Sequence, residues 1–199
     1  MNLTTMRSLV RRDLKDEDSA NYRWTNDEID RAIQRAVDEF SKYNQAEQKT
    51  DIVTVSGNRD LSIASLSGLI AVDAVEFPKG YWPKSFVSFS IYQTTLSMEV
   101  LGDGTSATLY WRSVHTLNTS TSTIPVQYES LIALGASGYA VLVWSQYGTN
   151  RQNIAGDTVD RDYLYWGKGR EMEFQKELKR ISKKLKQGTL YAIENDRDN

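Results

Sequence analysis

Residues 124–144 read IPVQYESLIALGASGYAVLVW and form the most apolar stretch of the chain. Small residues occupy its middle, at Gly135, Ala136, Ser137, Gly138 and Ala140. Because small side chains let two backbones approach closely, we expect a core helix that crosses a second helix at short range. The helix that begins after Thr25 is the predicted partner. Packing within one domain and packing between subunits both fit this composition.

The expected partner helix lies in YRWTNDEIDRAIQRAVDEFSKY, residues 22–43. Thr25 is placed to cap it, and Glu28 stands where the second half of a capping box belongs. Trp24 and Ile29 match a hydrophobic staple across the same turn. Apolar residues then recur at helical spacing, at Ile29, Ala32, Ile33, Ala36, Val37, Phe40 and Tyr43. This pattern predicts a helix with one buried stripe and a well-defined start.

Residues 49–123 differ in character from the segments on either side. Short segments such as TDIVTVSG, LIAVDAVEFP and TSATLYWRSV are rich in β-branched and aromatic residues and are separated by Gly, Pro, Asn and Asp. Such segments favour strands joined by turns, without room for crossover helices. The sequence GDGT at 102–105 predicts a tight turn between two of the strands. We therefore expect a small antiparallel sheet or sandwich.

Helical patterns return after Pro125, which suits a first helical turn. This helix is expected to end near Gln146, and a long polar helix is expected to cover residues 158–187. The apolar seam of the long helix is Phe174, Leu178, Ile181 and Leu185. The predicted fold class is α+β, a helical bundle domain interrupted by an inserted antiparallel β subdomain and followed by an extended C-terminal tail. The predicted bounds are 1–48 plus 124–187 for the helical domain, 49–123 for the β subdomain and 188–199 for the tail.

The composition gives no sign of a charged partner or a membrane. The 199 residues carry 24 Lys and Arg against 26 Asp and Glu, so no net charge attracts nucleic acid or a membrane surface. The longest apolar run, Leu131–Trp144, is shorter than the roughly 20 residues that span a bilayer. The first residues lack the apolar core of a signal peptide. We expect a soluble protein that works in the compartment where it is made.

The residue types that most enzymes need are scarce. There is no cysteine, and His115 is the single histidine, at the end of a predicted strand where we expect a structural role. No HExxH motif is present, DTVDRD at 157–162 lacks the glycine and distal glutamate of a calcium loop, and GKGR at 167–170 lacks the rest of a phosphate loop. We expect no enzyme activity, no cofactor and no metal. A hydrolase with two carboxylates stays open as an alternative, because paired acids leave no sequence motif.

Three features in a fixed order carry a resemblance to a known family. They are Arg23-Trp24-Thr25 with the acidic residues that follow to Asp30, Ile124-Pro125 before a helix, and the small-residue core of Leu131–Ala140. With the β block between them, they make the chain resemble the head–tail adaptor proteins of tailed bacteriophages, also called head-completion or connector proteins. The resemblance covers nearly the whole chain. It rests on order and spacing, because none of the three features is a catalytic signature.

The resemblance implies a structural protein of the virion at the head–tail interface, made in the cytoplasm of the host bacterium. Such proteins form homo-oligomeric rings, usually of twelve subunits, that dock under the portal protein and extend the DNA channel. The far side of the ring receives the tail, nozzle or stopper protein. Genomic double-stranded DNA passes through the lumen without sequence-specific binding, and no membrane is involved. Many members from long-tailed phages are nearly all helical, so the β block leaves the tail type open.

The resemblance also suggests a docking segment at the C-terminus. In several members this segment reaches into the portal and becomes ordered only there. The matching residues by position are Leu190, Tyr191 and Ile193, in a tail too short to fold alone. We expect the tail to be mobile in the free protein and buried on the portal.

A carbohydrate-binding or receptor-binding β module of a virion is the alternative function. Tyr81, Trp82, Tyr92 and Trp111 would then stack on sugar rings. The same aromatic residues also fit a sheet core with cross-strand pairs. The sequence leaves both interpretations open.

Overall fold

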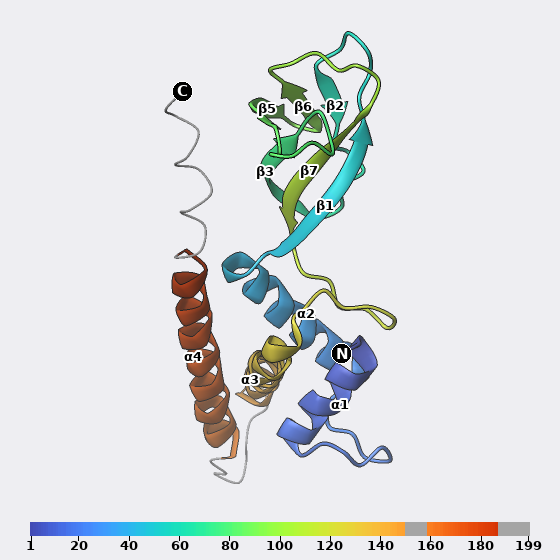
Figure 1. Cartoon of the computed structure of the whole chain (residues 1–199). Helices are drawn as coiled ribbons and strands as arrows, with labels where there is room; N and C mark the ends of the chain where they lie inside the picture. Colours follow the sequence, from blue (N-terminus) through green and yellow to red (C-terminus); the bar gives the residue numbers. More distant parts are fainter. Residues whose placement is uncertain (150–158, 187–199) are drawn as a thin grey trace. The chain divides into compact units, whose positions relative to one another are not determined.

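The chain is an α+β protein. The computed structural model describes residues 1–149 and 159–186, and it describes side chains for residues 1–146 and 162–182. These residues form four α-helices and two antiparallel β-sheets. The chain divides into two compact units, which can be followed in Figure 1: a helical unit of Met1–Asn44 and His115–Asn199, and a β unit of Gln45–Val114.

Four helices make up the described part of the helical unit. Their bounds are Leu3–Leu14 (α1), Asn26–Tyr43 (α2), Glu129–Thr149 (α3) and Val159–Lys186 (α4). A 3-10 turn at Val126–Tyr128 lies between Pro125 and α3, so the proline precedes this turn and not the first turn of the α-helix itself. α3 is apolar on all sides and packs against each of the other three helices. It is therefore the central helix of this unit.

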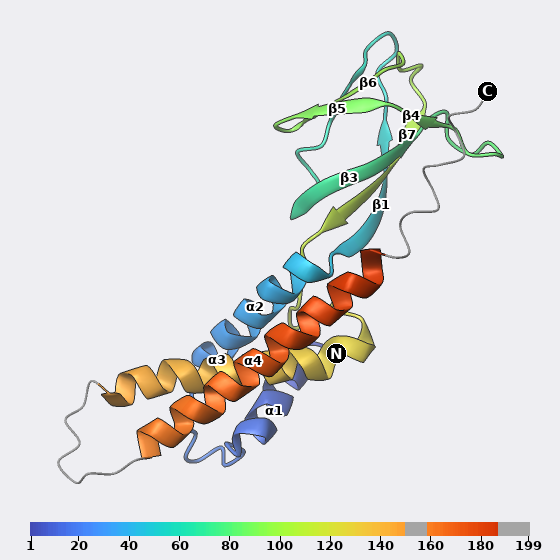
Figure 2. The same cartoon turned by 90° about the vertical axis from the view of Figure 1, so that its left-hand side faces the viewer.

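α3 and α4 approach each other at backbone contact distance, and Figure 2 shows α4 crossing α3. A Cβ atom added at Gly138 would lie 3.3 Å from the Gly167 carbonyl oxygen, and one added at Gly167 would lie 3.3 Å from that of Gly138. A Cβ atom at Gly135 would lie 2.9 Å from the ring of Phe174. These glycines therefore make room for α4, and the prediction that they face α2 is wrong. A glycine pattern indicates a close backbone approach but does not identify the helix that makes it.

α2 packs into the same core through its apolar stripe. The shared core includes Ile29, Ala32, Ile33, Ala36, Val37 and Phe40 from α2, Ala136 and Ala140 from α3, and Phe174, Leu178 and Ile181 from α4. Just before α2, the Trp24 indole N–H donates a hydrogen bond to the Ala140 carbonyl oxygen at 3.3 Å. Leu185, the fourth residue of the predicted seam, lies outside the residues whose side chains are described.

The helical segment Val126–Gln146 is long and apolar enough to cross a membrane by length and composition, with a mean hydropathy of 1.2. The expectation that the apolar run is too short therefore does not hold for the whole helical segment. However, 56% of its most apolar 18-residue window is buried within the protein, where the other helices cover it. Burial in a core accounts for this composition without a bilayer.

The β unit consists of two antiparallel sheets that share one core. The strand order is β1-β7-β3-β4 in the first sheet and β2-β6-β5 in the second. The strands are Ala46–Val53 (β1), Asp60–Ser62 (β2), Leu69–Glu76 (β3), Phe86–Val87 (β4), Phe89–Tyr92 (β5), Thr95–Met98 (β6) and Ser106–Ser113 (β7). The core includes Leu61, Leu96 and Met98 from the second sheet and Val75, Leu109 and Trp111 from the first.

The limits of the β unit differ from the predicted 49–123. β1 begins at Ala46 because it pairs with Ser113 at the far end of β7. Residues 115–123 belong to the helical unit, where the Leu3 N–H donates to the Asn118 carbonyl oxygen at 2.9 Å and Leu117 is buried in the helical core. Hydrogen bonds to distant helices decide this boundary, and composition alone does not reveal them.

GDGT at 102–105 lies between two strands, as predicted, but it does not close a hairpin. It joins β6 to β7, and these two strands belong to different sheets. A Cβ atom at Gly102 would lie 2.6 Å from the Val55 carbonyl oxygen, so the glycine here permits a close approach to the chain after β1.

We expect Gly135→Ala to lower the free energy of unfolding by about 1–3 kcal/mol, because the added methyl group overlaps the buried Phe174 ring. The matched control is Gly169→Ala in α4, where a Cβ atom would meet nothing within 4 Å. The control should be unchanged or should gain up to about 1 kcal/mol from helix propensity. Urea unfolding of both variants measures the difference. Equal stability of the two variants would contradict the close crossing.

Candidate functional site: an aromatic pocket and a fixed loop

The chain between α1 and α2 is held by a buried ion pair. Arg11 Nη1 lies 2.5 Å from Asp16 Oδ2, and Arg11 Nη2 donates to the Trp24 carbonyl oxygen at 2.9 Å. Asp16 Oδ1 accepts the Arg23 backbone N–H at 2.7 Å. Removing one partner of such a pair typically costs about 3–5 kcal/mol, because the other charge is left buried. The pair therefore fixes where the Trp24 side chain enters the core.

A capping box at the start of α2 directly follows this ion-paired segment. The Thr25 hydroxyl oxygen accepts the Glu28 backbone N–H at 3.3 Å, and Glu28 Oε2 accepts the Thr25 backbone N–H at 2.7 Å. Trp24 and Ile29, the two residues of the staple pattern, are both buried in the helical core. Thr25 and Glu28 themselves are exposed, and a cap of this kind contributes about 0.5–2 kcal/mol. These residues define the start of α2.

Aromatic side chains from α3 and α4 gather beside Trp24. The rings of Trp144 and Tyr163 lie 4.9 Å apart between centroids, edge to face. The Arg23 guanidinium lies 5.1 Å from the Trp144 ring and donates a hydrogen bond to the Tyr163 hydroxyl. The cation–π contact attaches α3 to the residues before α2, and the hydrogen bond attaches the first turns of α4 to the same residues.

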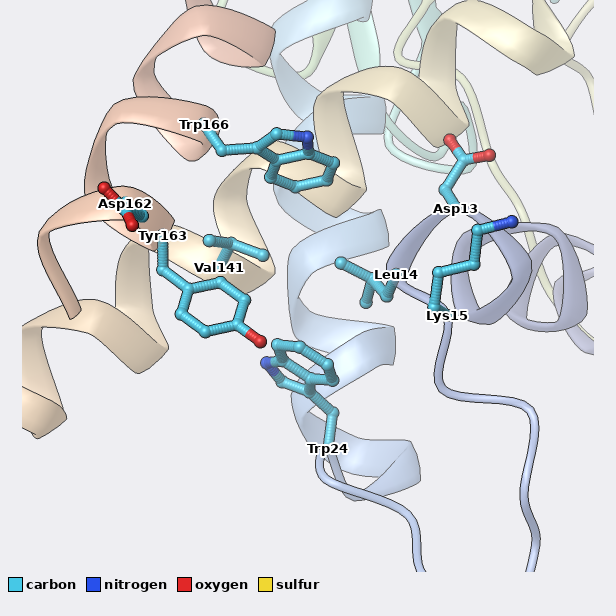
Figure 3. A pocket seen from close by; sticks show the side chains of 8 residues that line it. All are labelled: Asp13, Leu14, Lys15, Trp24, Val141, Asp162, Tyr163 and Trp166. Carbon is cyan, nitrogen blue, oxygen red and sulfur yellow. The ribbon is translucent and has the colours of Figure 1, made fainter. Parts of the chain in front are cut away.

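A pocket of about 570 Å³ opens beside this cluster. Its lining consists of Asp13, Leu14, Lys15, Trp24, Val141, Asp162, Tyr163 and Trp166, and we call it the aromatic pocket. Figure 3 shows Trp166, Tyr163 and Trp24 around one open space, with Leu14 across from Tyr163. Asp13 accepts a hydrogen bond from Arg170, whose guanidinium lies 4.8 Å from the Trp166 ring.

The aromatic pocket has the character of a binding site for an apolar side chain. Concave sites with mostly aromatic and aliphatic walls and a few polar groups are the usual form of binding pockets. Among the described residues, no group of three or more histidine, aspartate or glutamate side chains lies close enough to hold a metal ion. The residues of this pocket offer shape and apolar surface rather than a metal site.

The β unit has a second unusual feature in the β3–β4 loop, residues 77–85. Glu76, at the end of β3, accepts the Gly80 N–H at 3.2 Å and the Tyr110 hydroxyl at 2.6 Å. Lys84 Nζ lies 3.3 Å from Glu76 Oε2 and donates to the Tyr110 hydroxyl at 2.5 Å. The Tyr110 hydroxyl, the Gly80 N–H and Lys84 together hold the pKa of Glu76 below its ordinary value. Gly80 and Lys84 of the loop are thus attached to one carboxylate.

A second ion pair attaches the same loop to β1. Lys79 Nζ lies 2.5 Å from Asp51 Oδ2, and the other carboxylate oxygen accepts the Thr108 hydroxyl at 2.5 Å. The bond from Lys79, followed by that from Thr108, lowers the pKa of Asp51. The β3–β4 loop is therefore fixed to three strands of the first sheet.

The tip of this loop carries Tyr81 and Trp82, whose exposed fractions are 66% and 90%. Tyr92 is also exposed, but it ends β5 in the other sheet, and Figure 2 shows the β5–β6 turn on the opposite side of the unit from the β3–β4 loop. Trp111 is buried in the core. The four aromatic residues considered for sugar stacking therefore do not form one surface.

His115 has a structural environment. It is buried, its Nδ1 lies 3.0 Å from the Thr123 carbonyl oxygen, and its ring lies 5.0 Å from the Phe40 ring. Burial lowers the pKa of His115 below its ordinary value. The imidazole thus helps to hold residues 115–123 against α2.

The site residues predicted from the sequence are separated in the structure. Trp24 lines the aromatic pocket, Gly135 and Gly138 lie at the α3–α4 crossing, and Ala136 is fully buried. The predicted docking residues, Leu190, Tyr191 and Ile193, lie outside the described residues. Sequence analysis missed Tyr163 and Trp166; their spacing on one face of a polar helix, in DYLYWGKGR, is the pattern that points to them.

Comparisons with known proteins identify no family: no protein-family model and no curated protein matches the sequence.

We expect the free energy of unfolding to fall as the pH is lowered from about 7 to about 5.5, with a slope of at most about 1.4 kcal/mol per pH unit. The pKa of His115 is lower in the folded protein than in the unfolded chain, so the unfolded chain binds the proton first. Stability from this group is therefore present above the ordinary histidine pKa and is lost below it. Urea unfolding across this range should show the slope in the natural protein. The His115→Gln variant should lack it, and an equal slope in both would assign the effect to other groups.

Proposed function

We propose that this chain is a structural subunit of the head–tail connector of a tailed bacteriophage. In this proposal a helical bundle domain, interrupted by an inserted antiparallel β subdomain, assembles with identical copies into a ring, usually of twelve. The ring docks under the portal, extends the DNA channel and receives the tail, nozzle or stopper protein. The order of sequence features that resembles the adaptor family supports the location in the virion.

The β3–β4 loop is the single observation that carries an assembly role. An exposed tryptophan beside an exposed tyrosine is costly in a protein that makes no contacts, and these residue types dominate the binding energy of protein interfaces. Ion pairs to Asp51 and Glu76 hold the loop in place, so little conformational entropy is lost on binding. A fixed aromatic tip is therefore suited to docking against a protein surface.

We place portal docking in the C-terminal tail, residues 188–199. Leu190, Tyr191 and Ile193 supply its apolar anchor, and acidic residues follow them in ENDRDN. In a ring, neighbouring tails bind at high effective concentration, which offsets the entropy that each tail loses. The proposal assigns the chain no catalytic step, no cofactor and no sequence-specific contact with DNA.

A carbohydrate-binding or receptor-binding module is the second candidate. Tyr81 and Trp82 favour it, because exposed aromatic faces also stack on sugars. A glycan array with the full chain tests this candidate, and binding that Trp82→Ala removes would support it over the connector.

The connector proposal predicts that the chain joins portal rings from the same genome and forms an added ring beneath them in negative-stain images. Deleting residues 188–199 should leave the melting temperature unchanged and abolish attachment, so that filled heads lose DNA. Replacing Leu190, Tyr191 and Ile193 together by Ser should have the same effect.

Two results would count against this assignment. A full-length chain that stays unbound beside intact portal rings contradicts the connector role. A truncated chain that binds with normal affinity places the docking element elsewhere in the chain.

A further inference from the structure

β1 is a long strand at the edge of the first sheet. In the strand order β1-β7-β3-β4 it is terminal, and all eight of its residues, Ala46–Val53, pair with β7 in unbroken register. Among the described residues, no strand pairs with its other side. Edge strands are often protected from pairing with another chain by proline, by a bulge or by a short length, and β1 has none of these features. It can therefore accept a further strand.

The hydrogen bonds at the end of β1 show which of its residues face the open edge. The Thr54 N–H, directly after β1, donates to the Thr105 carbonyl oxygen at 2.8 Å and continues the β1–β7 register. Hydrogen-bonded and non-hydrogen-bonded pairs alternate along an antiparallel ladder, so the even-numbered residues of β1 bond to β7. The N–H and C=O groups of the odd-numbered residues point away from β7. These residues are Glu47, Lys49, Asp51 and Val53.

A second copy of β1 matches this edge in length. The other edge strands, β2, β4 and β5, have three, two and four residues, so none of them can pair along the whole of β1. Two copies of β1 can pair antiparallel about a two-fold axis at Lys49, through residues 46–52, or at Thr50, through residues 47–53. Both registers leave the same length of strand paired.

The charges on β1 distinguish these two registers. An axis at Lys49 would oppose this lysine to its own copy and Glu47 to Asp51, and like charges directly opposite destabilise a sheet. An axis at Thr50 instead places Lys49 of each copy opposite Asp51 of the other. The charged residues therefore favour one self-complementary register and disfavour the alternative.

The groups around Asp51 leave room for this pairing. Asp51 binds Lys79 and the Thr108 hydroxyl, but its side chain stays 42% exposed, and a carboxylate has about four acceptor sites. Lys49 is exposed on the same strand. Glu47 and Asp51 balance Lys49 and Lys79 in charge, so two such edges do not repel each other by net charge.

We infer that two copies of the free chain join through β1, antiparallel about a two-fold axis at Thr50, into one continuous sheet. The four odd-numbered residues of each strand exchange up to about eight backbone hydrogen bonds with the other copy. This contact is isologous and closes on itself, so it does not build a ring. The inference concerns the chain before assembly and goes beyond the proposed function. The dimer covers an edge that would otherwise pair with other extended segments.

Disulfide trapping tests the register, because the chain has no cysteine of its own. In the inferred dimer Thr50 faces its own copy in a non-hydrogen-bonded pair, with Cα atoms about 4.5 Å apart, which suits a disulfide. The full-length Thr50→Cys chain should therefore form a linked dimer under mild oxidation. Gln48→Cys in β1 and Ser90→Cys in β5 are the controls, because neither residue meets its own copy. Equal linking of all three variants would indicate random collision and contradict the contact.

Charge reversal tests the same contact without a new cysteine, by analytical ultracentrifugation of the full chain. Lys49→Glu places a carboxylate opposite Asp51 at two positions of the dimer. It should raise the dissociation constant about 10-fold or more. Lys179→Glu makes the same charge change at an exposed residue of α4 and should leave the dissociation constant unchanged.

Three results would overturn the inference. The first is a natural chain that stays monomeric at concentrations up to about 1 mM. The second is a dimer that Lys49→Glu and Lys179→Glu affect equally, because the contact would then lie on another surface. The third is a chain that dimerises only after deletion of residues 187–199, because that segment and not a second copy would then cover β1. These measurements need no portal protein, so their failure leaves the connector role standing, and failure of the connector role leaves the dimer standing.

Discussion

The backbone contact between α3 and α4 at Gly138 and Gly167 is the constraint on which the helical unit depends. Because neither residue has a side chain, α4 can lie directly on α3 and place Phe174 in the core. Trp166 immediately precedes Gly167, so the same crossing sets one wall of the aromatic pocket. α3 is covered in this way by three other helices, and the aromatic pocket and the β3–β4 loop are two features of the protein surface.

Local signals in the sequence were sufficient for much of the fold. The capping box at Thr25 and Glu28 and the apolar stripe of α2 are decided by residues within one or two turns of each other. The short β-rich segments likewise indicate antiparallel strands. The helix that the glycines of α3 face was not predictable, because small residues permit a close approach by any helix. The three-residue strand β2 and the placement of residues 115–123 depend on hydrogen bonds to distant segments and leave no local pattern.

The candidate site, like the fold, was predictable from the sequence only in part. Trp24 is recognisable from its position before a helix cap, but the pocket that it lines also needs α1, α3 and α4, which are far apart in the sequence. Trp111 and Trp82 are the same residue type, so composition alone does not tell which of them is exposed. The alternation along β7 directs Trp111 into the core with Leu109, whereas Trp82 lies in a loop that is attached to the outer side chains of the sheet. Exposure therefore depends on register and on long-range ion pairs, which only the folded chain defines.

In our proposal the function of this protein depends on contacts with identical copies and with a portal, and the central claim of the proposal is the location of the chain. Cryo-electron microscopy of the portal vertex in DNA-filled particles tests that claim most directly. We predict density for a closed ring of this α+β chain against the portal, coaxial with the DNA channel. Particles in which other proteins fill the junction completely, with this chain absent or found only on fibres distant from the portal, would contradict it.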